Sequence, residues 1–128
     1  FGNNFVNTML RLFNDKDSIS VVADQIGSPT NAIDLANAIL EIVSKDELVY
    51  GIYNYSNEGE CSWFEFAQKI KEFSGSSIEI NPVPTSAYPT KAKRPAYSLL
   101  DKSKIKEVYQ LEIPTWEDSL KEELKHLI

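Results

Sequence analysis

The sequence predicts one α/β domain, residues 1–128, in which short strands alternate with about five helices. Three observations lead to this prediction. Apolar residues recur at helical spacing in five stretches, short β-prone runs lie between the earlier ones, and Gly, Pro, Asn and Ser fill the breaks. A chain of 128 residues, 42% hydrophobic and 25% charged, has the composition of a globular domain rather than a disordered one.

The first half of the chain predicts two helices and two strands. Asn3 or Asn4 caps a first helix with a broad apolar face, and a strand over 19–22 follows it. A second helix spans about 31–44, and an alternating strand spans 51–57. The second helix has an apolar stripe that we expect to be buried, made of Ile33, Ala36, Ile39, Leu40 and Val43.

The second half predicts one more strand and three more helices. Ser62 and Glu65 have capping-box spacing, so a helix begins there and ends near Phe73. A short strand covers 78–80 and is ended by prolines at 82 and 84. A fourth helix begins at Asp101 or Ser103 and ends at Tyr109, and a second capping box, Thr115 to Asp118, opens the last helix.

Two connections between these elements stand out as candidate binding loops. The segment 24–30, Asp-Gln-Ile-Gly-Ser-Pro-Thr, follows a strand and feeds a helix, which is where α/β proteins usually place ligands. An ordinary strand-to-helix connection would have the same pattern. The stretch 81–97 lacks periodicity, contains four prolines and gathers Lys91, Lys93 and Arg94, although a solvated surface loop is its simpler interpretation.

Composition argues against several classes of partner. The net charge of −6 and a pI near 4.8, without a basic run, argue against nucleic acid and anionic membrane surfaces. No apolar stretch approaches the roughly 20 residues of a membrane-spanning helix. The single cysteine, Cys61, excludes an internal disulfide and fits a reducing cytoplasm, so we expect a cytoplasmic protein.

The residues that catalysis and cofactor binding require are missing from the pattern. The five glycines, at 2, 27, 51, 59 and 75, are too far apart to form a loop around a pyrophosphate. No tyrosine has a lysine four residues later, and one histidine, His126, with one cysteine cannot make a structural zinc site. We therefore expect no catalytic residue, no bound cofactor and no metal site within this chain.

Groups able to bind an anion are easier to find. Arg94, one of two arginines, lies in the proline-rich stretch, and Gln25 offers a donor and an acceptor from segment 24–30. Asn4 stands at a helix start, where it and the backbone N–H groups of Phe5 and Val6 could meet a phosphate. The sequence thus suggests a phosphate bound by Asn4, Gln25 and Arg94, while the same residues could equally hold the loops to one another.

Several segments in this order resemble one family over nearly the whole chain. They are Asn-Phe-Val-x-Thr-Met-Leu-Arg from Asn4, Val-x-Asp-Gln-Ile-Gly-Ser-Pro-Thr from Val22, Gly-Ile-Tyr from Gly51, Ser-Trp-x-x-Phe-Ala from Ser62, and Pro-Thr-Ser-x-Tyr-Pro-Thr-x-Ala-x-Arg-Pro-Ala-Tyr-Ser-x-Leu-Asp from Pro84. They resemble the C-terminal part of the dTDP-4-dehydrorhamnose reductases, which are extended short-chain dehydrogenase/reductases. The segments around Gly27 and Arg94 are the specific ones.

The resemblance implies a parent enzyme that uses NADPH (or NADH) to reduce dTDP-4-dehydro-6-deoxy-L-mannose to dTDP-L-rhamnose. This chain would be the C-terminal, substrate-binding part of its Rossmann-type fold, and an N-terminal Rossmann part upstream of Phe1 would hold the cofactor loop and the catalytic Tyr and Lys. The resemblance assigns Asn4 and Arg94 to the diphosphate of the dTDP-sugar. It also implies that five residues of the loop lie beside the sugar or the nucleotide, namely Gln25, Gly27, Ser28, Pro29 and Thr30.

Other expectations and alternatives follow from the same resemblance. Family members form homodimers in some cases, with magnesium at the interface. The same scaffold occurs in a non-catalytic regulatory subunit of methionine adenosyltransferase. Another nucleotide-sugar epimerase or dehydratase is the remaining alternative, and the product of the full-length protein would distinguish it.

Overall fold

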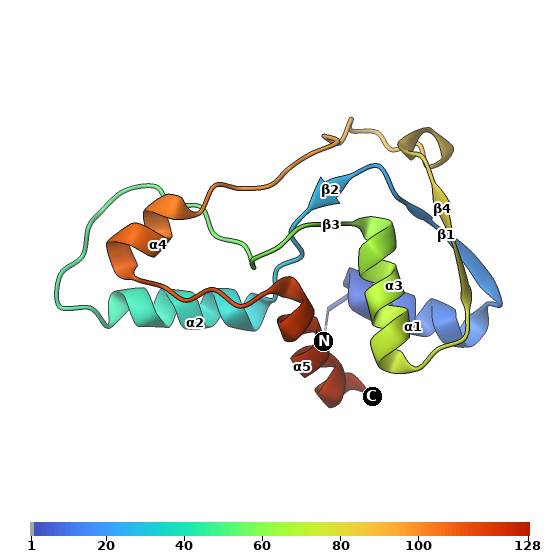
Figure 1. Ribbon diagram of the computed structural model, residues 1–128, viewed down its shortest axis with the longest axis horizontal. Coiled ribbons are helices and arrows are strands. Elements are labelled where there is room, and N and C mark those ends of the chain that lie inside the picture. Colours follow the sequence, from blue (N-terminus) through green and yellow to red (C-terminus); the bar gives the residue numbers. More distant parts are fainter. Residues whose placement is uncertain (1) are drawn as a thin grey trace.

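A computed structural model describes residues 2–128, which form five α-helices, four short strands and one 3₁₀ turn (Figure 1). Phe1 lies outside the described residues. The α/β class and the five predicted helices are confirmed. In chain order the elements are α1 (Phe5–Asp15), β1 (Ser18–Val22), β2 (Ile26–Gly27), α2 (Ala32–Val43), β3 (Cys61–Ser62), α3 (Trp63–Ser74), β4 (Glu79–Val83), η1 (Thr85–Ala87), α4 (Ser103–Tyr109) and α5 (Trp116–Leu127).

Side-chain caps set the starts of the helices. The Asn4 side chain accepts a hydrogen bond from Asn7 N (2.8 Å) at the start of α1, and Asn31 accepts one from Ile33 N (2.7 Å) at the start of α2. Ser62 makes the predicted capping box at the start of α3. Because a cap satisfies N–H groups that the helix itself leaves unpaired, these positions fix the helix boundaries locally.

The strands form two separate pairs. β1 runs parallel to β4, with Val21 opposite Pro82, whereas β2 runs antiparallel to β3, with Gly27 opposite Cys61. The predicted end of the strand near residue 80 was wrong, because β4 continues through Pro82 to Val83. In a two-stranded sheet each strand is an edge, so the missing N–H of proline can face away from the partner strand.

The predicted strand over 51–57 is absent from the described structure. No backbone–backbone hydrogen bond among residues 2–128 involves the segment 46–57, and only Glu58 beyond it forms an isolated bridge, to Thr115. The segment alternates in sequence as predicted, but none of the described strands lies beside it to complete a ladder. Ile52, within this segment, is 88% exposed.

The prediction that the apolar stripe of α2 is buried was also wrong. Ile39 is 52% exposed and Leu40 is 64% exposed, while the helix contributes only Ala38 to the buried residues. α2 lies beside α4 at one end of an elongated molecule, away from β1 and β4 (Figure 1). The face with Ala38 packs on a small cluster from the α4 region, and no described element covers the opposite face.

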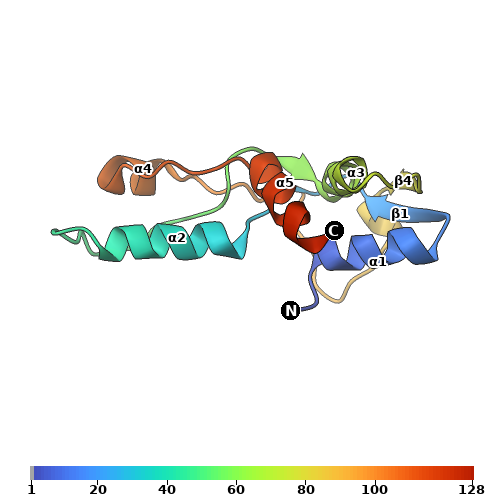
Figure 2. The same cartoon turned by 90° about the horizontal axis from the view of Figure 1, so that it is seen from below.

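The main core surrounds α3. Ala67 and Ile70 of this helix are fully buried, and α3 contacts α1, α5, β1 and β4. Seen from the side, α1 and α2 lie in one layer and α3 and α4 in another, and α5 runs from the second layer toward α1 (Figure 2). The buried residues of this core are Met9, Val21, Cys61, Phe66, Ala67, Ile70, Ile78, Ile80, Trp116, Leu120 and Leu124. Within residues 2–128, no helix has both the length and the apolar character needed to cross a membrane.

Candidate functional site

A cleft of about 200 Å³ opens where the segment after β1 meets the start of α3 and the end of the proline-rich stretch. Five of the residues predicted to bind substrate line it, namely Gln25, Gly27, Ser28, Pro29 and Arg94. The other lining residues are Ile26, Cys61, Ser62, Trp63, Phe66, Pro95 and Ser98. The structure therefore brings Gln25 and Arg94, from two distant segments, to one cavity.

Main-chain pairing brings the proline-rich stretch to this cleft. Ile26 N donates to Ala96 O (2.8 Å), and Ser98 N donates to Ile26 O (2.9 Å). β2 thus lies between β3 on one side and the segment around Tyr97 on the other. A Cβ on Gly27 would lie 3.0 Å from Ser98 Oγ, so the small residue permits this close approach.

Asp24 fixes the other end of the stretch. Its carboxylate accepts hydrogen bonds from Thr85 N (2.9 Å) and from the Thr85 hydroxyl (2.5 Å), and these bonds lower the pKa of Asp24. The Gln25 amide donates to the same hydroxyl (3.2 Å). The proline-rich stretch is therefore tied to the segment after β1 at Thr85 and again at Ala96, and Arg94 lies between these two ties.

Arg94 is the cationic group of the cleft. Its side chain is exposed, and it makes no hydrogen bond or ion pair with any other residue in the described part of the chain. The guanidinium offers five N–H donors in a planar fork, which suits a carboxylate or a phosphate. The cleft thus combines an unengaged cation with backbone and amide groups around it, which can bind an anion.

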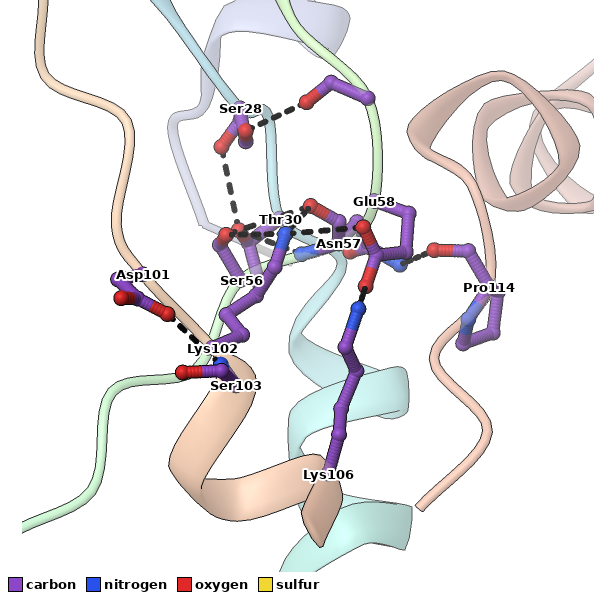
Figure 3. A network of polar contacts seen from close by, with 11 residues as sticks. Ser28, Thr30, Ser56, Asn57, Glu58, Asp101, Lys102, Ser103, Lys106 and Pro114 are labelled. Atoms are coloured by element: carbon purple, nitrogen blue, oxygen red, sulfur yellow. Dashed lines mark hydrogen bonds and ion pairs between the residues drawn. The ribbon is translucent and has the colours of Figure 1, made fainter. Parts of the chain in front are cut away.

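The hydroxyls of Ser28 and Thr30 are used within the protein. Ser28 Oγ donates to Gly59 O (2.6 Å), and Thr30 Oγ1 donates to Ser28 O (3.2 Å) while accepting from Asn57 N (3.3 Å), as Figure 3 shows. These contacts correspond to the alternative in which the motif residues hold the loops to one another.

Asn4, Phe5 and Val6 line a second cleft, of about 410 Å³, together with Pro29 and Thr30. The structure does not bring Asn4 into one cavity with Gln25 and Arg94, although both clefts share Pro29, Trp63 and Phe66 as walls. Phe5 stacks on Phe66 with their ring centroids 5.4 Å apart, so this side chain belongs to the packing of the domain.

Sequence reasoning missed several cleft residues that a signal could have identified. Ser62 and Trp63, and Pro95 and Ser98, lie in two of the motif segments quoted above, yet only Arg94 of those segments was assigned to the site. Cys61 gave no signal, since a cysteine beside a helix cap is equally a core residue. Burial raises the pKa of the Cys61 thiol to about 12, which leaves it protonated and unsuited to nucleophilic attack.

Comparison with known proteins gives consistent results. The family model described as the RmlD substrate binding domain matches residues 1–128. A dTDP-4-dehydrorhamnose reductase from Aggregatibacter actinomycetemcomitans is 40% identical over 131 residues, covering 94% of this chain and 45% of that protein. The spore coat polysaccharide biosynthesis protein SpsK of Bacillus subtilis is 45% identical over 124 residues, covering 97% of this chain and 42% of that protein.

A solved structure supports the same relationship. The crystal structure of a dTDP-4-dehydrorhamnose reductase from Bacillus anthracis, in complex with NADP, superposes with a TM-score of 0.91 at 41% identity. The superposition covers 100% of this chain and 44% of that one, so the chain spans less than half the length of the relatives it matches. Sequence, fold and cleft agree, and the chain belongs to the RmlD substrate binding domain family.

Proposed function

We propose that this chain is the substrate-binding part of a longer NADPH-dependent reductase that converts dTDP-4-dehydro-6-deoxy-L-mannose to dTDP-L-rhamnose for polysaccharide biosynthesis. The observation that supports this most is the family match over residues 1–128, joined to relatives named as dTDP-4-dehydrorhamnose reductases. The regulatory subunit of methionine adenosyltransferase finds no support in these relatives. An epimerase or dehydratase has only the shared fold in its favour.

We assign the diphosphate of the dTDP-sugar to the cleft with Arg94. Two features support this assignment: the Arg94 guanidinium has no partner among the described residues, and Gln25 lies in the same cavity. A charged fork facing a phosphate gives short, bidentate hydrogen bonds. The backbone of 27–30 then lies beside the sugar or the nucleotide. Asn4, Phe5 and Val6 would meet another part of an extended ligand, through the second cleft.

Titration calorimetry with dTDP tests this assignment on the chain itself. Arg94→Ala should weaken dTDP binding by about 1.5–3 kcal/mol, the range for a hydrogen bond to a charged group, or roughly ten- to hundredfold in Kd. Arg11→Ala removes the other arginine, which lies exposed on α1, and should leave Kd unchanged. Equal affinities for the wild type and Arg94→Ala would remove Arg94 from the site.

We propose that hydride and proton transfer depend on a part of the parent protein that this chain does not contain. A dinucleotide needs a glycine-rich turn at a helix start, and the five dispersed glycines here do not provide one. Among residues 2–128, no group of three His, Cys, Asp or Glu side chains could hold a metal ion. The residues present therefore do not fit NADPH or magnesium, and no step is derived through either.

We further propose that the N-terminal Rossmann part of the parent covers the exposed face of α2. The apolar side chains of that face are 39% to 64% exposed, and they are Ile33, Leu35, Ile39, Leu40 and Val43. Contiguous apolar surface of this kind marks an interface. The relatives are more than twice as long as this chain, which supports a covering segment from the same polypeptide.

The unpaired segment that follows α2 fits the same partner. Residues 51–55 alternate in sequence, and their backbone has no ladder partner within residues 2–128. In α/β folds a helix packs on the sheet that the next strand joins. A strand from the Rossmann part beside 51–55 would pair these groups and would place its sheet against α2. This arrangement also explains why the pattern predicts a strand that the described chain alone does not form.

A further inference from the structure

Asn57 is fully buried, and both polar atoms of its side chain form hydrogen bonds. Figure 3 shows its contacts with Thr30, Lys102 and Pro114. Its Oδ1 accepts from the backbone N–H of Asn31 (2.7 Å), and its own backbone N–H donates to Thr30 Oγ1 (3.3 Å). Its Nδ2, which carries two hydrogens, lies within hydrogen-bond distance of three acceptors in α2, α5 and the chain before α5. Those three acceptors are Asp34 Oδ2 (2.7 Å), Pro114 O (3.1 Å) and Ser119 Oγ (3.1 Å).

We propose that Asn57 is a positioning residue for the ligand: it holds the Thr30 hydroxyl and the backbone N–H of Asn31. It thereby sets the shape of segment 27–31, whose residues line the first cleft up to Pro29 and the second cleft from Pro29 onward. This inference rests on the proposed function only for the identity of the ligand. Asn57 itself lines neither cleft. It acts through the loop that does.

Three hydrogen bonds connect the loop to the segment around Asn57. Segment 57–59 holds the loop at three points: Asn57 Oδ1 to Asn31 N, Asn57 N to Thr30 Oγ1, and Gly59 O to Ser28 Oγ. The three bonds alternate between donors and acceptors of the loop. Because two-residue β2 leaves the rest of the loop without ladder bonds, these contacts supply its fixed geometry.

The segment that holds the loop is itself anchored. Lys102 is 7% exposed and donates to Asn57 O (2.9 Å) and Ser56 Oγ (3.3 Å), and its Nζ lies 3.5 Å from a Glu58 carboxylate oxygen. Lys106 pairs with Glu58 at 2.6 Å, which together with the nearby charge of Lys102 lowers the pKa of Glu58. Buried polar groups that are fully satisfied in this way make a region rigid.

The test compares loss of the loop contacts with loss of a buried hydrogen bond elsewhere. Asn57→Ala removes the hydrogen bond to Asn31 N. Thr30→Val removes the hydroxyl that accepts from Asn57 N. Because Thr30 is exposed, this second variant should fold even if the change at the buried Asn57 does not permit folding. Tyr109→Phe is the control, since the buried Tyr109 hydroxyl bonds to Val49 at the far end of the molecule. Each variant is measured by amide hydrogen exchange of Ser28, Thr30 and Asn31 without ligand and by titration with dTDP.

The two loop variants should speed exchange at Asn31 about tenfold and weaken dTDP binding about tenfold, the effect of roughly one lost hydrogen bond. Tyr109→Phe should lower the unfolding temperature without changing either quantity. Unchanged exchange or unchanged dTDP affinity in a folded loop variant would overturn the proposal, as would an equal loss of affinity in Tyr109→Phe. Should the wild type fail to bind dTDP, the proposed function fails, while ligand-free exchange still decides whether Asn57 orders the loop.

Discussion

At the scale of single residues, Cys61 lies in the candidate site but is too buried to be reactive. The thiol is in the wall of the first cleft but only 5% exposed, and its pKa is about 12. The folded chain should therefore react with iodoacetamide at neutral pH at least roughly tenfold more slowly than the chain unfolded in guanidinium, since the thiolate is the reactive form. Mass spectrometry of the alkylated protein measures both rates. Equal rates would mean that the cleft wall opens readily.

Two glycines with positive φ allow a matched prediction. Gly59 has φ +87°, and a Cβ there would lie 3.0 Å from Trp116 Cδ1, whereas Gly75 has φ +71° with open space around it. Gly75→Ala should cost only the conformational penalty, about 1–2 kcal/mol in the free energy of unfolding. Gly59→Ala should cost about 1–3 kcal/mol more, because the buried Trp116 ring must shift.

Urea denaturation of the two glycine variants measures the difference. The unfolding slope should stay constant, so that the midpoint reports stability alone. Equal losses in the two variants would show that the Trp116 ring yields without cost.

Which residues could be predicted depends on how far their partners lie along the chain. Asn4, Asn31 and Ser62 cap helices through bonds that reach only two or three residues, so their pattern is legible in the sequence. Asn57 and Lys102 depend on partners 23 to 62 residues away, and nothing local marks a buried amide or lysine as a junction.

At the scale of elements, the Asp24–Thr85 contact joins the segment after β1 to the 3₁₀ turn η1. The hydrogen bonds from Thr85 lower the pKa of Asp24, so they stabilise the folded state while the carboxylate is charged. This stabilisation is complete above the unfolded pKa near 4 and is lost as the pH falls through the lower folded pKa.

Asp24→Asn should thus lower the unfolding temperature at neutral pH, and the difference from wild type should shrink as the pH falls below about 4. Asp46→Asn is the control, because Asp46 has no hydrogen bond or ion pair among residues 2–128. Thermal unfolding by circular dichroism across this pH range compares the three proteins. A pH-independent difference would contradict the role of the Asp24 charge.

Element prediction succeeded for the helices and failed for most of the pairing. Four of the five helices have a side-chain cap within their own sequence, and each of the five lies where it was predicted. β2 and β3 have two residues each, too few to show alternation. They form only because the fold pairs Ile26 with Ser62 and Gly27 with Cys61, which lie far apart in the sequence. Residues 51–57 have the alternation but not the neighbouring strand, so pattern and structure differ there.

At the scale of the whole molecule, the residues of the candidate site could be predicted, but their grouping into two clefts could not. The family resemblance located the loop 27–30 and Arg94, and the structure adds that Gly27, Ser28 and Pro29 share one cleft with Arg94. The resemblance could not indicate that Asn4 lines a different cavity from Arg94. The packing of Phe5 against Trp63, between α1 and α3, determines which of the two clefts each residue lines. Which loops come together in one cleft depends on how the helices of the core pack, and the sequence of each loop does not contain this information.

The exposed face of α2 leads to a prediction about association. Without a covering partner, an apolar surface that includes Leu40 and Val43, at 64% and 62% exposure, should favour contact between copies of the chain. Sedimentation velocity should therefore show concentration-dependent self-association, which the double variant Leu40→Glu, Val43→Glu reduces. Asn37→Glu adds a charge at an exposed polar position of the same helix and should leave it unchanged.

The same variants distinguish the two occupants of that face. If the Rossmann part covers α2 in the parent protein, the double variant should destabilise the full-length protein while making this chain more monomeric, because a charge buried at an interface costs free energy that an exposed one does not. Thermal unfolding of the full-length protein provides the measurement. A double variant that leaves full-length stability unchanged would contradict the proposal that the Rossmann part covers α2.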